Sequence, residues 1–188
     1  MTPETLFVPP TAHSPNSTLP VLRYPNAITD KSLNGAVSTI QGPEWRKGGH
    51  WVIGREKLAA TPHYHSITHE AYTVLKGTGT YLLGRSPLDA EVDASGNEIG
   101  VKFVAREGDV FVFPAGVMHY VTATEGEYEI VGFYNLNERS SEEEPYDMHY
   151  GLGSVKETEE MRVKCEMVAT PLHDPVYGKG GPMCTLWR

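Results

Sequence analysis

The feature that most constrains this chain is a histidine-rich segment, residues 63–72, which carries three histidines and one glutamate, all side chains of the kinds that bind metals. His63 and His65 are one residue apart, and on an extended strand such side chains point to the same face. A short polar break follows, and Glu70 then begins a second alternating run. Two adjacent antiparallel strands can therefore direct both imidazoles and the carboxylate toward a common point.

A fourth candidate ligand lies in a separate segment, residues 108–119. This segment reads as a strand, then a turn around Pro114 and Gly116, and then a new strand that begins at His119. Neutral imidazole and carboxylate groups suit borderline divalent metals such as iron, manganese, nickel, copper and zinc. We therefore predict one divalent transition-metal site, with the identity of the metal left open. Its four predicted ligands are His63, His65, Glu70 and His119.

These two segments resemble the two sequence motifs of the cupin superfamily. The residues that match the first motif are His63, His65, Glu70 and Gly77. The residues that match the second are Gly108, Pro114, Gly116 and His119. The chain departs from the motifs at Lys57 and Ala123, where the motifs have glycine and asparagine, and neither position supplies a ligand. A further likeness, to a group of single-domain bacterial and fungal cupins, is carried by residues 19–22, 63–70 and 174–178.

The resemblance implies an all-β fold, a double-stranded β-helix of the cupin or jelly-roll barrel type with an N-terminal arm and a short C-terminal helix. The length of the chain, 188 residues, indicates a single domain over residues 1–188. Within that domain we expect the arm at 1–44, the barrel core at 45–137, and a C-terminal loop, helix and docking tail at 138–188. The composition agrees with this fold class, because 19 glycines and 14 prolines suit short strands joined by tight turns.

Local patterns predict where the strands lie. Short apolar or alternating runs predict strands over residues 50–55, 80–84, 101–105, 110–113, 119–123 and 128–134. Residues 45–49 read as a loop, and residues 93–97 have the turn chemistry of a hairpin tip. Strands at this spacing with turns between them are typical of a sandwich or barrel.

The two ends of the chain have their own signals. Residues 19–24 alternate like a strand, and Pro20 and Pro25 predict that this strand lies at the edge of a sheet. A partly ordered tail is the alternative for this N-terminal region. Near the other end, Ser154 followed by Glu157 is a capping-box pattern, which predicts a short helix directly after it. Alternating apolar residues later in the same segment also fit a strand.

The bulk properties restrict partners and location. A net charge of −8 argues against nucleic acid or an anionic membrane surface as a partner. No run approaches the roughly 18 to 20 apolar residues of a membrane span, and the first residues show no secretory signal, so a cytoplasmic protein is expected. Cys165 and Cys184 are expected to be reduced thiols. The proline-punctuated arm could pair across subunits, which makes a homodimer the expected assembly.

Two residues next to the predicted ligands need separate treatment. Tyr72 shares the face of Glu70, so both are candidate catalytic residues, and a core tyrosine is the alternative for Tyr72. His69 should face away from the metal and either support the site from behind or lie at the surface.

The four remaining histidines lack a spacing that ties them to the site. Three cationic residues could meet an anionic substrate but are expected at the surface: Arg55, Arg85 and Lys102.

Three classes of function stay open. The resemblance favours an oxidoreductase of the dioxygenase type, because three histidines and a glutamate are the ligand set of dioxygenase and oxalate-degrading cupins. The first alternative is a non-redox isomerase, epimerase or decarboxylase, in which the metal polarises a carbonyl and Glu70 or Tyr72 moves protons. The second is a non-catalytic module that binds a small ligand, including the case in which the four polar residues only hydrogen-bond to one another. In each class the expected partner is a small molecule inside the barrel.

Overall fold

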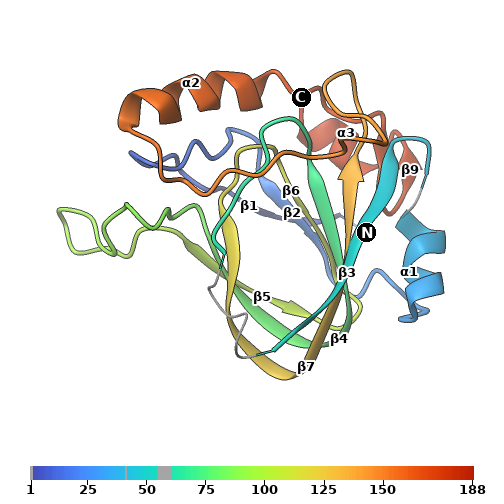
Figure 1. Ribbon diagram of the computed structural model, residues 1–188. Coiled ribbons are helices and arrows are strands. Elements are labelled where there is room, and N and C mark those ends of the chain that lie inside the picture. Colours follow the sequence, from blue (N-terminus) through green and yellow to red (C-terminus); the bar gives the residue numbers. More distant parts are fainter. Residues whose placement is uncertain (1, 41, 55–60) are drawn as a thin grey trace.

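The computed structural model describes residues 2–40, 42–54 and 61–188. Its main sheet consists of β1 (Glu4–Leu6), β2 (Val21–Tyr24), β3 (Trp45–Ile53), β4 (Glu70–Leu83), β5 (Val101–Arg106), β6 (Val110–Phe113) and β7 (His119–Asn135). The strands are paired in the order β1-β2-β6-β4-β7-β3, and β5 pairs with β4. This sheet curls into a barrel, and helix α2 (Val155–Glu166) lies across one end of it (Figure 1). The expected mostly β, jelly-roll type of fold is thus confirmed.

The two longest strands, β4 and β7, form the centre of the sheet. They pair antiparallel from Glu70 opposite Tyr134 to Leu83 opposite His119. The register shifts at three places along this ladder, and such bulges bend a strand pair and increase its twist. The same strand β4 pairs with β6 through Glu70 opposite Phe113. The start of β4 is therefore held between two strands, deep in the barrel.

Strand β6 shows why both faces of the sheet are covered. Its residues Val110–Phe113 form a continuous apolar run, and all four are buried. Phe111 and Phe113 pack inside the barrel with other aromatic rings, whereas the two valines pack in a second cluster on the outer face. Helices α1 (Leu33–Ile40) and α3 (Pro182–Leu186) contribute to this outer cluster. A short apolar run of this kind is what a strand buried on both faces requires.

The C-terminal segment confirms one prediction and adds an element. The expected helix is α2, and its capping box is complete: the Ser154 hydroxyl accepts the Glu157 N–H, and the Glu157 carboxylate accepts the Ser154 N–H. A small two-stranded sheet follows, made of β8 (His173–Asp174) and β9 (Gly178–Lys179). The chain then ends in α3, and Trp187 after it is buried against the barrel.

The prediction of an edge strand in the N-terminal arm was wrong. Strand β2 lies between β1 and β6 and pairs with both. Pro20 and Pro25 lie immediately outside the strand, so neither removes a hydrogen bond from the ladder. The arm therefore supplies an interior strand of the barrel sheet, and all but one of the strand's residues are buried.

The predicted loop at residues 45–49 was also wrong, because these residues form the first half of β3. A bulge between Lys47 and Gly49 lets the strand follow β7. A Cβ atom added to Gly48 would lie 2.1 Å from the Tyr134 ring, and one added to Gly49 would lie 2.1 Å from the Trp51 ring. The two glycines are needed for this close approach, and they do not mark a turn.

Two smaller points complete the comparison. The strands expected at 119–123 and 128–134 are a single strand, β7, whereas the hairpin tip at 93–97 is confirmed by the Asp93 N–H bond to the Asn97 carbonyl. Arg55 and Lys57 lie outside the described residues. Among the residues that are described, no helix is long and apolar enough to cross a membrane.

Candidate metal centre

Four side chains from three parts of the barrel meet at one point. His63, His65, Glu70 and His119 each offer a ligand atom, and these atoms all lie within 4.8 Å of one another. His63 and His65 precede β4, Glu70 is the first residue of β4, and His119 is the first residue of β7. The group predicted from the sequence therefore comes together.

Backbone pairing holds two of these residues side by side. The His119 N–H donates to the His63 carbonyl at 2.9 Å, and the His63 N–H donates to the His119 carbonyl at 3.3 Å. The two imidazole rings are 4.4 Å apart between centroids. This reciprocal pair closes the barrel at the site and places both rings without any contribution from a ligand.

All three histidines turn the same ring nitrogen toward the centre. Each Nδ1 atom hydrogen-bonds to a backbone carbonyl, which only accepts, so each Nδ1 carries the hydrogen. The partners are Thr61 for His63 at 2.8 Å, Asp147 for His65, and Val117 for His119 at 2.9 Å. In that tautomer Nε2 has a free lone pair, and such a carbonyl contact is the usual partner of a metal-binding histidine.

The inner atoms of the cluster need a positive charge between them. Glu70 Oε2 lies 3.0 Å from His65 Nε2 and 3.3 Å from His119 Nε2. When Nδ1 carries the hydrogen, each Nε2 has only a lone pair, so these contacts place a nitrogen acceptor against a carboxylate oxygen, which is also an acceptor. Among the described residues, Glu70 Oε1 and His119 Nε2 are buried without any hydrogen-bond partner, and such buried polar atoms call for an ion or another explanation. The donor set therefore fits a divalent cation.

The electrostatics of the cluster agree with this assignment for His63 and Glu70, whereas His65 would release a proton from Nε2 when a metal binds. Burial, followed by repulsion from His119, lowers the pKa of His63 to about 3. Burial opposes the charge of Glu70, but the neighbouring His65 and His119 outweigh it and hold the pKa of Glu70 below its usual range. Burial likewise disfavours a charged His65, yet the Glu70 carboxylate raises the pKa of His65. A neutral His63 and an ionised Glu70 are the forms that bind metal.

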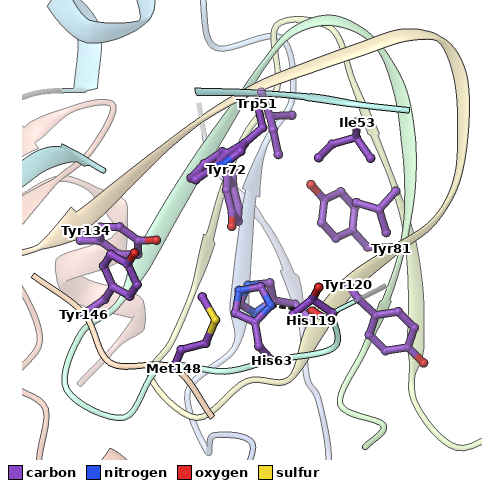
Figure 2. A pocket seen from close by; sticks show the side chains of 13 residues that line it. Trp51, Ile53, His63, Tyr72, Tyr81, His119, Tyr120, Tyr134, Tyr146 and Met148 are labelled. Atoms are coloured by element: carbon purple, nitrogen blue, oxygen red, sulfur yellow. Dashed lines mark hydrogen bonds between the residues drawn. The ribbon is translucent and has the colours of Figure 1, made fainter. Parts of the chain in front are cut away.

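A cavity of about 360 Å³ opens next to the cluster, inside the barrel. His63 and His119 form part of its wall, and most of the remaining wall is aromatic or aliphatic. Figure 2 shows the Tyr72 hydroxyl directed toward these two histidines, with Tyr134 and Tyr146 on one side. Tyr72 therefore faces the cavity, as the alternation from Glu70 predicts.

Tyr72 is a neutral hydrogen-bond donor in this setting. Burial, and then the negative charge of Glu70, raises the pKa of Tyr72 well above its usual value of 10. The phenol therefore keeps its proton at neutral pH. Its ring packs 6.1 Å from the His119 ring and 6.0 Å from the Trp51 ring, which fixes its direction.

His69 is outside the cluster, and it is buried where a surface position was one expectation. Its Nδ1 accepts the Ala115 N–H at 3.0 Å, and its Nε2 donates to the Ala169 carbonyl at 3.2 Å. The ring packs against Trp187 at 4.8 Å between centroids. Burial lowers the pKa of His69 to about 4, so the ring is neutral.

The remaining candidates lie away from the cluster, as expected. Three of the other four histidines have partners elsewhere: Gly153 for His13, Glu129 for His50 and Glu44 for His173. His149 is the exception to the expectation, because it contacts Asp147, the residue whose carbonyl holds His65. Arg85 faces Glu91, and Lys102 faces Glu98.

Sequence reasoning missed the segment 146–149, which follows the acidic loop. Tyr146 and Met148 line the cavity, and the Asp147 carbonyl holds His65. Tyr146 also stacks on Tyr134, with ring centroids 4.4 Å apart. The one available signal was the apolar side chain on each side of Asp147, which indicates a common face in an extended segment.

Comparison with known proteins finds one matching family model and one similar protein that is matched over most of its length. The family model described as Cupin matches residues 53–144. The chain is 28% identical over 185 residues to the uncharacterized protein YjlB of Bacillus subtilis (strain 168), a match that covers 98% of this chain and 96% of the other.

Similar solved structures include an 11S globulin, a vicilin and a ketoisomerase. The 11S globulin from Wrightia tinctoria is 12% identical with a TM-score of 0.34, covering 70% of this chain and 22% of that one. The vicilin from hazelnut, Corylus avellana, is 19% identical with a TM-score of 0.31 and coverages of 65% and 30%. The TDP-fucose-3,4-ketoisomerase WlaRA from Campylobacter jejuni is 10% identical with a TM-score of 0.37 and coverages of 62% and 75%. The chain spans less than one third of the length of the 11S globulin and of the vicilin.

Proposed function

The chain belongs to the cupin superfamily, and from that premise we propose that it is a metal-dependent oxidoreductase of the dioxygenase type. Its substrate is a small organic molecule bound inside the barrel. One observation carries the proposal: three Nε2 atoms and the Glu70 carboxylate converge beside a largely aromatic cavity of about 360 Å³. That volume lies in the range of small-molecule sites.

The ligand set determines what the centre can hold. His63, His65, Glu70 and His119 would bind a divalent transition metal, for which imidazole and carboxylate ligands are suited. A redox-active metal supplies the one-electron chemistry that reactions with dioxygen need, and four protein ligands leave positions open on a six-coordinate ion.

The residues of the chain have three tasks in this proposal. The aromatic wall, with Trp51 and Tyr134 among its members, excludes water and packs against the substrate. Tyr72 keeps its proton and donates a hydrogen bond to a substrate oxygen placed next to His119. Glu70 stays ionised, so it neutralises part of the charge of the metal.

The experiment is metal analysis followed by oxygen consumption. Wild-type protein loaded separately with iron, manganese, copper and nickel is offered enolizable and catechol-like compounds, and dioxygen uptake is recorded. We expect uptake with at least one redox-active metal. The double variant His65→Ala, His119→Ala should lose the metal and the uptake together, whereas His50→Ala, a change outside the cluster, should keep both. Full metal content in the double variant would reject the ligand assignment.

The position of Tyr72 favours a second candidate, a non-redox isomerase, epimerase or decarboxylase. A neutral phenol facing a cavity beside an ionised carboxylate can move a proton to or from a substrate carbon or oxygen. Turnover of a carbonyl substrate by the zinc-loaded protein without dioxygen would support this candidate over the first. Tight metal binding without turnover of any compound under either condition would leave a non-catalytic binding module.

A further inference from the structure

The three histidines of the cluster differ in what holds their rings. His63 and His119 each donate Nδ1–H to the carbonyl of the residue two positions earlier. His65 donates to the carbonyl of Asp147, which is 82 residues further along the chain. The orientation of one ligand therefore depends on a distant segment that follows the last strand of the barrel.

The Asp147 side chain fastens that segment to the backbone next to His65. Its Oδ1 atom accepts the Ser66 N–H at 2.6 Å, and its Oδ2 atom accepts the Ser66 hydroxyl. Ser66 directly follows His65. The Asp147 carboxylate therefore accepts hydrogen bonds from the residue next to His65, and the Asp147 carbonyl accepts one from the His65 imidazole. These contacts fix the distance between the carbonyl and the ring.

Further contacts hold Asp147 from its other side. His149 Nε2 lies 2.8 Å from Oδ2, and Lys164 Nζ on α2 lies 3.6 Å from the same atom. Burial opposes the charge of Asp147, but hydrogen bonds from His149 and Ser66 outweigh it and keep the pKa of Asp147 well below its usual range. Reciprocal backbone hydrogen bonds between Tyr64 and His149, at 2.9 and 3.0 Å, hold the end of the segment 146–149 beside the residue that precedes His65. The carboxylate is thus ionised and has defined partners.

We propose that Asp147 is a positioning residue of the metal centre: by clamping the segment 146–149 to Ser66 it places its own carbonyl against His65 Nδ1 and aims His65 Nε2 at the metal. The inference rests on the proposed function, in which His65 is a ligand. Partners of this kind are worth about 10- to 100-fold in metal affinity. Asp147 touches the imidazole and not the metal, so its effect is on the geometry and affinity of the centre.

The test is a titration of the metal-free full-length protein with Co²⁺, followed by its visible absorption. In Asp147→Asn the amide nitrogen cannot accept the Ser66 hydroxyl or the His149 N–H, while the backbone carbonyl is retained. We expect Co²⁺ to bind roughly 10- to 100-fold more weakly, with a changed absorption spectrum because His65 is no longer held in one orientation.

The matched control is Asp89→Asn. Asp89 is also a half-buried clamp, which accepts Thr11 Oγ1 at 2.6 Å and the Ser86 N–H at 2.8 Å. This variant should lose thermal stability and keep both the Co²⁺ affinity and the spectrum. If Asp147→Asn does not fold, Ser66→Ala decides, since it removes only the hydroxyl contact, and a weaker Co²⁺ affinity is expected.

The outcomes separate the two levels of the inference. If Asp147→Asn binds Co²⁺ with the affinity and the spectrum of the wild type, the positioning role is overturned and the metal centre stands. The same result in Ser66→Ala has the same meaning if Asp147→Asn does not fold. A wild-type protein that does not bind Co²⁺ would overturn the metal centre and the positioning role together. A weakened affinity in Asp147→Asn that Asp89→Asn reproduces would also overturn the role, because general destabilisation would then explain it.

Discussion

Replacing His69 with glutamine should change how the free energy of unfolding depends on pH. In the folded chain the His69 ring is buried and neutral, and its Nδ1 accepts the Ala115 N–H. Burial lowers its pKa from 6.5 to about 4. Protonation of the ring would remove the acceptor and leave a charge in an apolar cluster next to Trp187. Folding therefore favours the neutral ring.

The sign and size of the effect follow from the two pKa values. Between pH 6.5 and pH 4 the unfolded chain binds a proton at His69 that the folded chain does not, so stability falls as the pH falls. A difference of roughly 2.5 pKa units at about 1.36 kcal/mol each corresponds to about 3 kcal/mol. This contribution to the free energy of unfolding is fully present above pH 6.5 and is lost by about pH 4.

The assay is urea unfolding of the chelator-treated protein, measured by tryptophan fluorescence from pH 7.5 to pH 4. At pH 7.5 the His69→Gln variant should be less stable by about 1–3 kcal/mol, because the Ala115 N–H loses its acceptor. As the pH falls, this deficit should shrink by about 3 kcal/mol, since the variant has no ring to protonate.

The control is Thr68→Val, which removes a buried hydroxyl that donates to the Asn135 carbonyl at 2.8 Å and has no titrating group. Its deficit should stay constant across the pH range. If the free energies of unfolding of His69→Gln and of the wild type change with pH in parallel, the account of a buried, neutral His69 is refuted.

Two further predictions concern the cavity and the turn before His119. For the isomerase, epimerase or decarboxylase candidate, Tyr72→Phe should keep full metal content and lower kcat by about 10²- to 10⁴-fold, the usual contribution of a proton-transferring group; unchanged kcat would remove Tyr72 from the catalytic assignment. Gly116→Ala should lose at least 1–3 kcal/mol in chemical denaturation, because φ is +90° and the added Cβ would lie 2.5 Å from the Asn16 carbonyl oxygen. Gly96→Ala, with φ of +84° and no atom within 4 Å, carries only the backbone strain and should lose less. Equal losses would show that the Asn16 contact is unimportant.

The part of the site that sequence reasoning could predict is the part with local spacing. His63, His65 and Glu70 are arranged by strand alternation and one short break, so their common direction follows from the chain itself. The Tyr72 position follows from the same alternation. The convergence of His119 on this group needs the barrel to close, which the resemblance to cupins supplied. Asp147 could not be predicted, because no periodic pattern links it to a ring 82 residues away.

The errors in the fold have physical causes of the same kind. Pro20 and Pro25 indicated an edge strand, but a proline disturbs a ladder only at a position that must donate, and both lie outside β2. Residues 45–49 read as a loop, but Gly48 and Gly49 within them make room for the rings of Tyr134 and Trp51 in a strand. In both cases the same residue type serves two structural purposes, and only the neighbouring strands decide between them.

The placement of β2 inside the sheet has a practical consequence for anyone who shortens this protein. A fragment trimmed to residues 53–144, the region that the family model matches, would lose β1, β2 and most of β3. Strand β6 would then expose its unpaired main-chain groups along one side, which invites aggregation. The same trimming would discard Asp147. Expression work should therefore keep both flanks, although they lie outside the region that the family model matches.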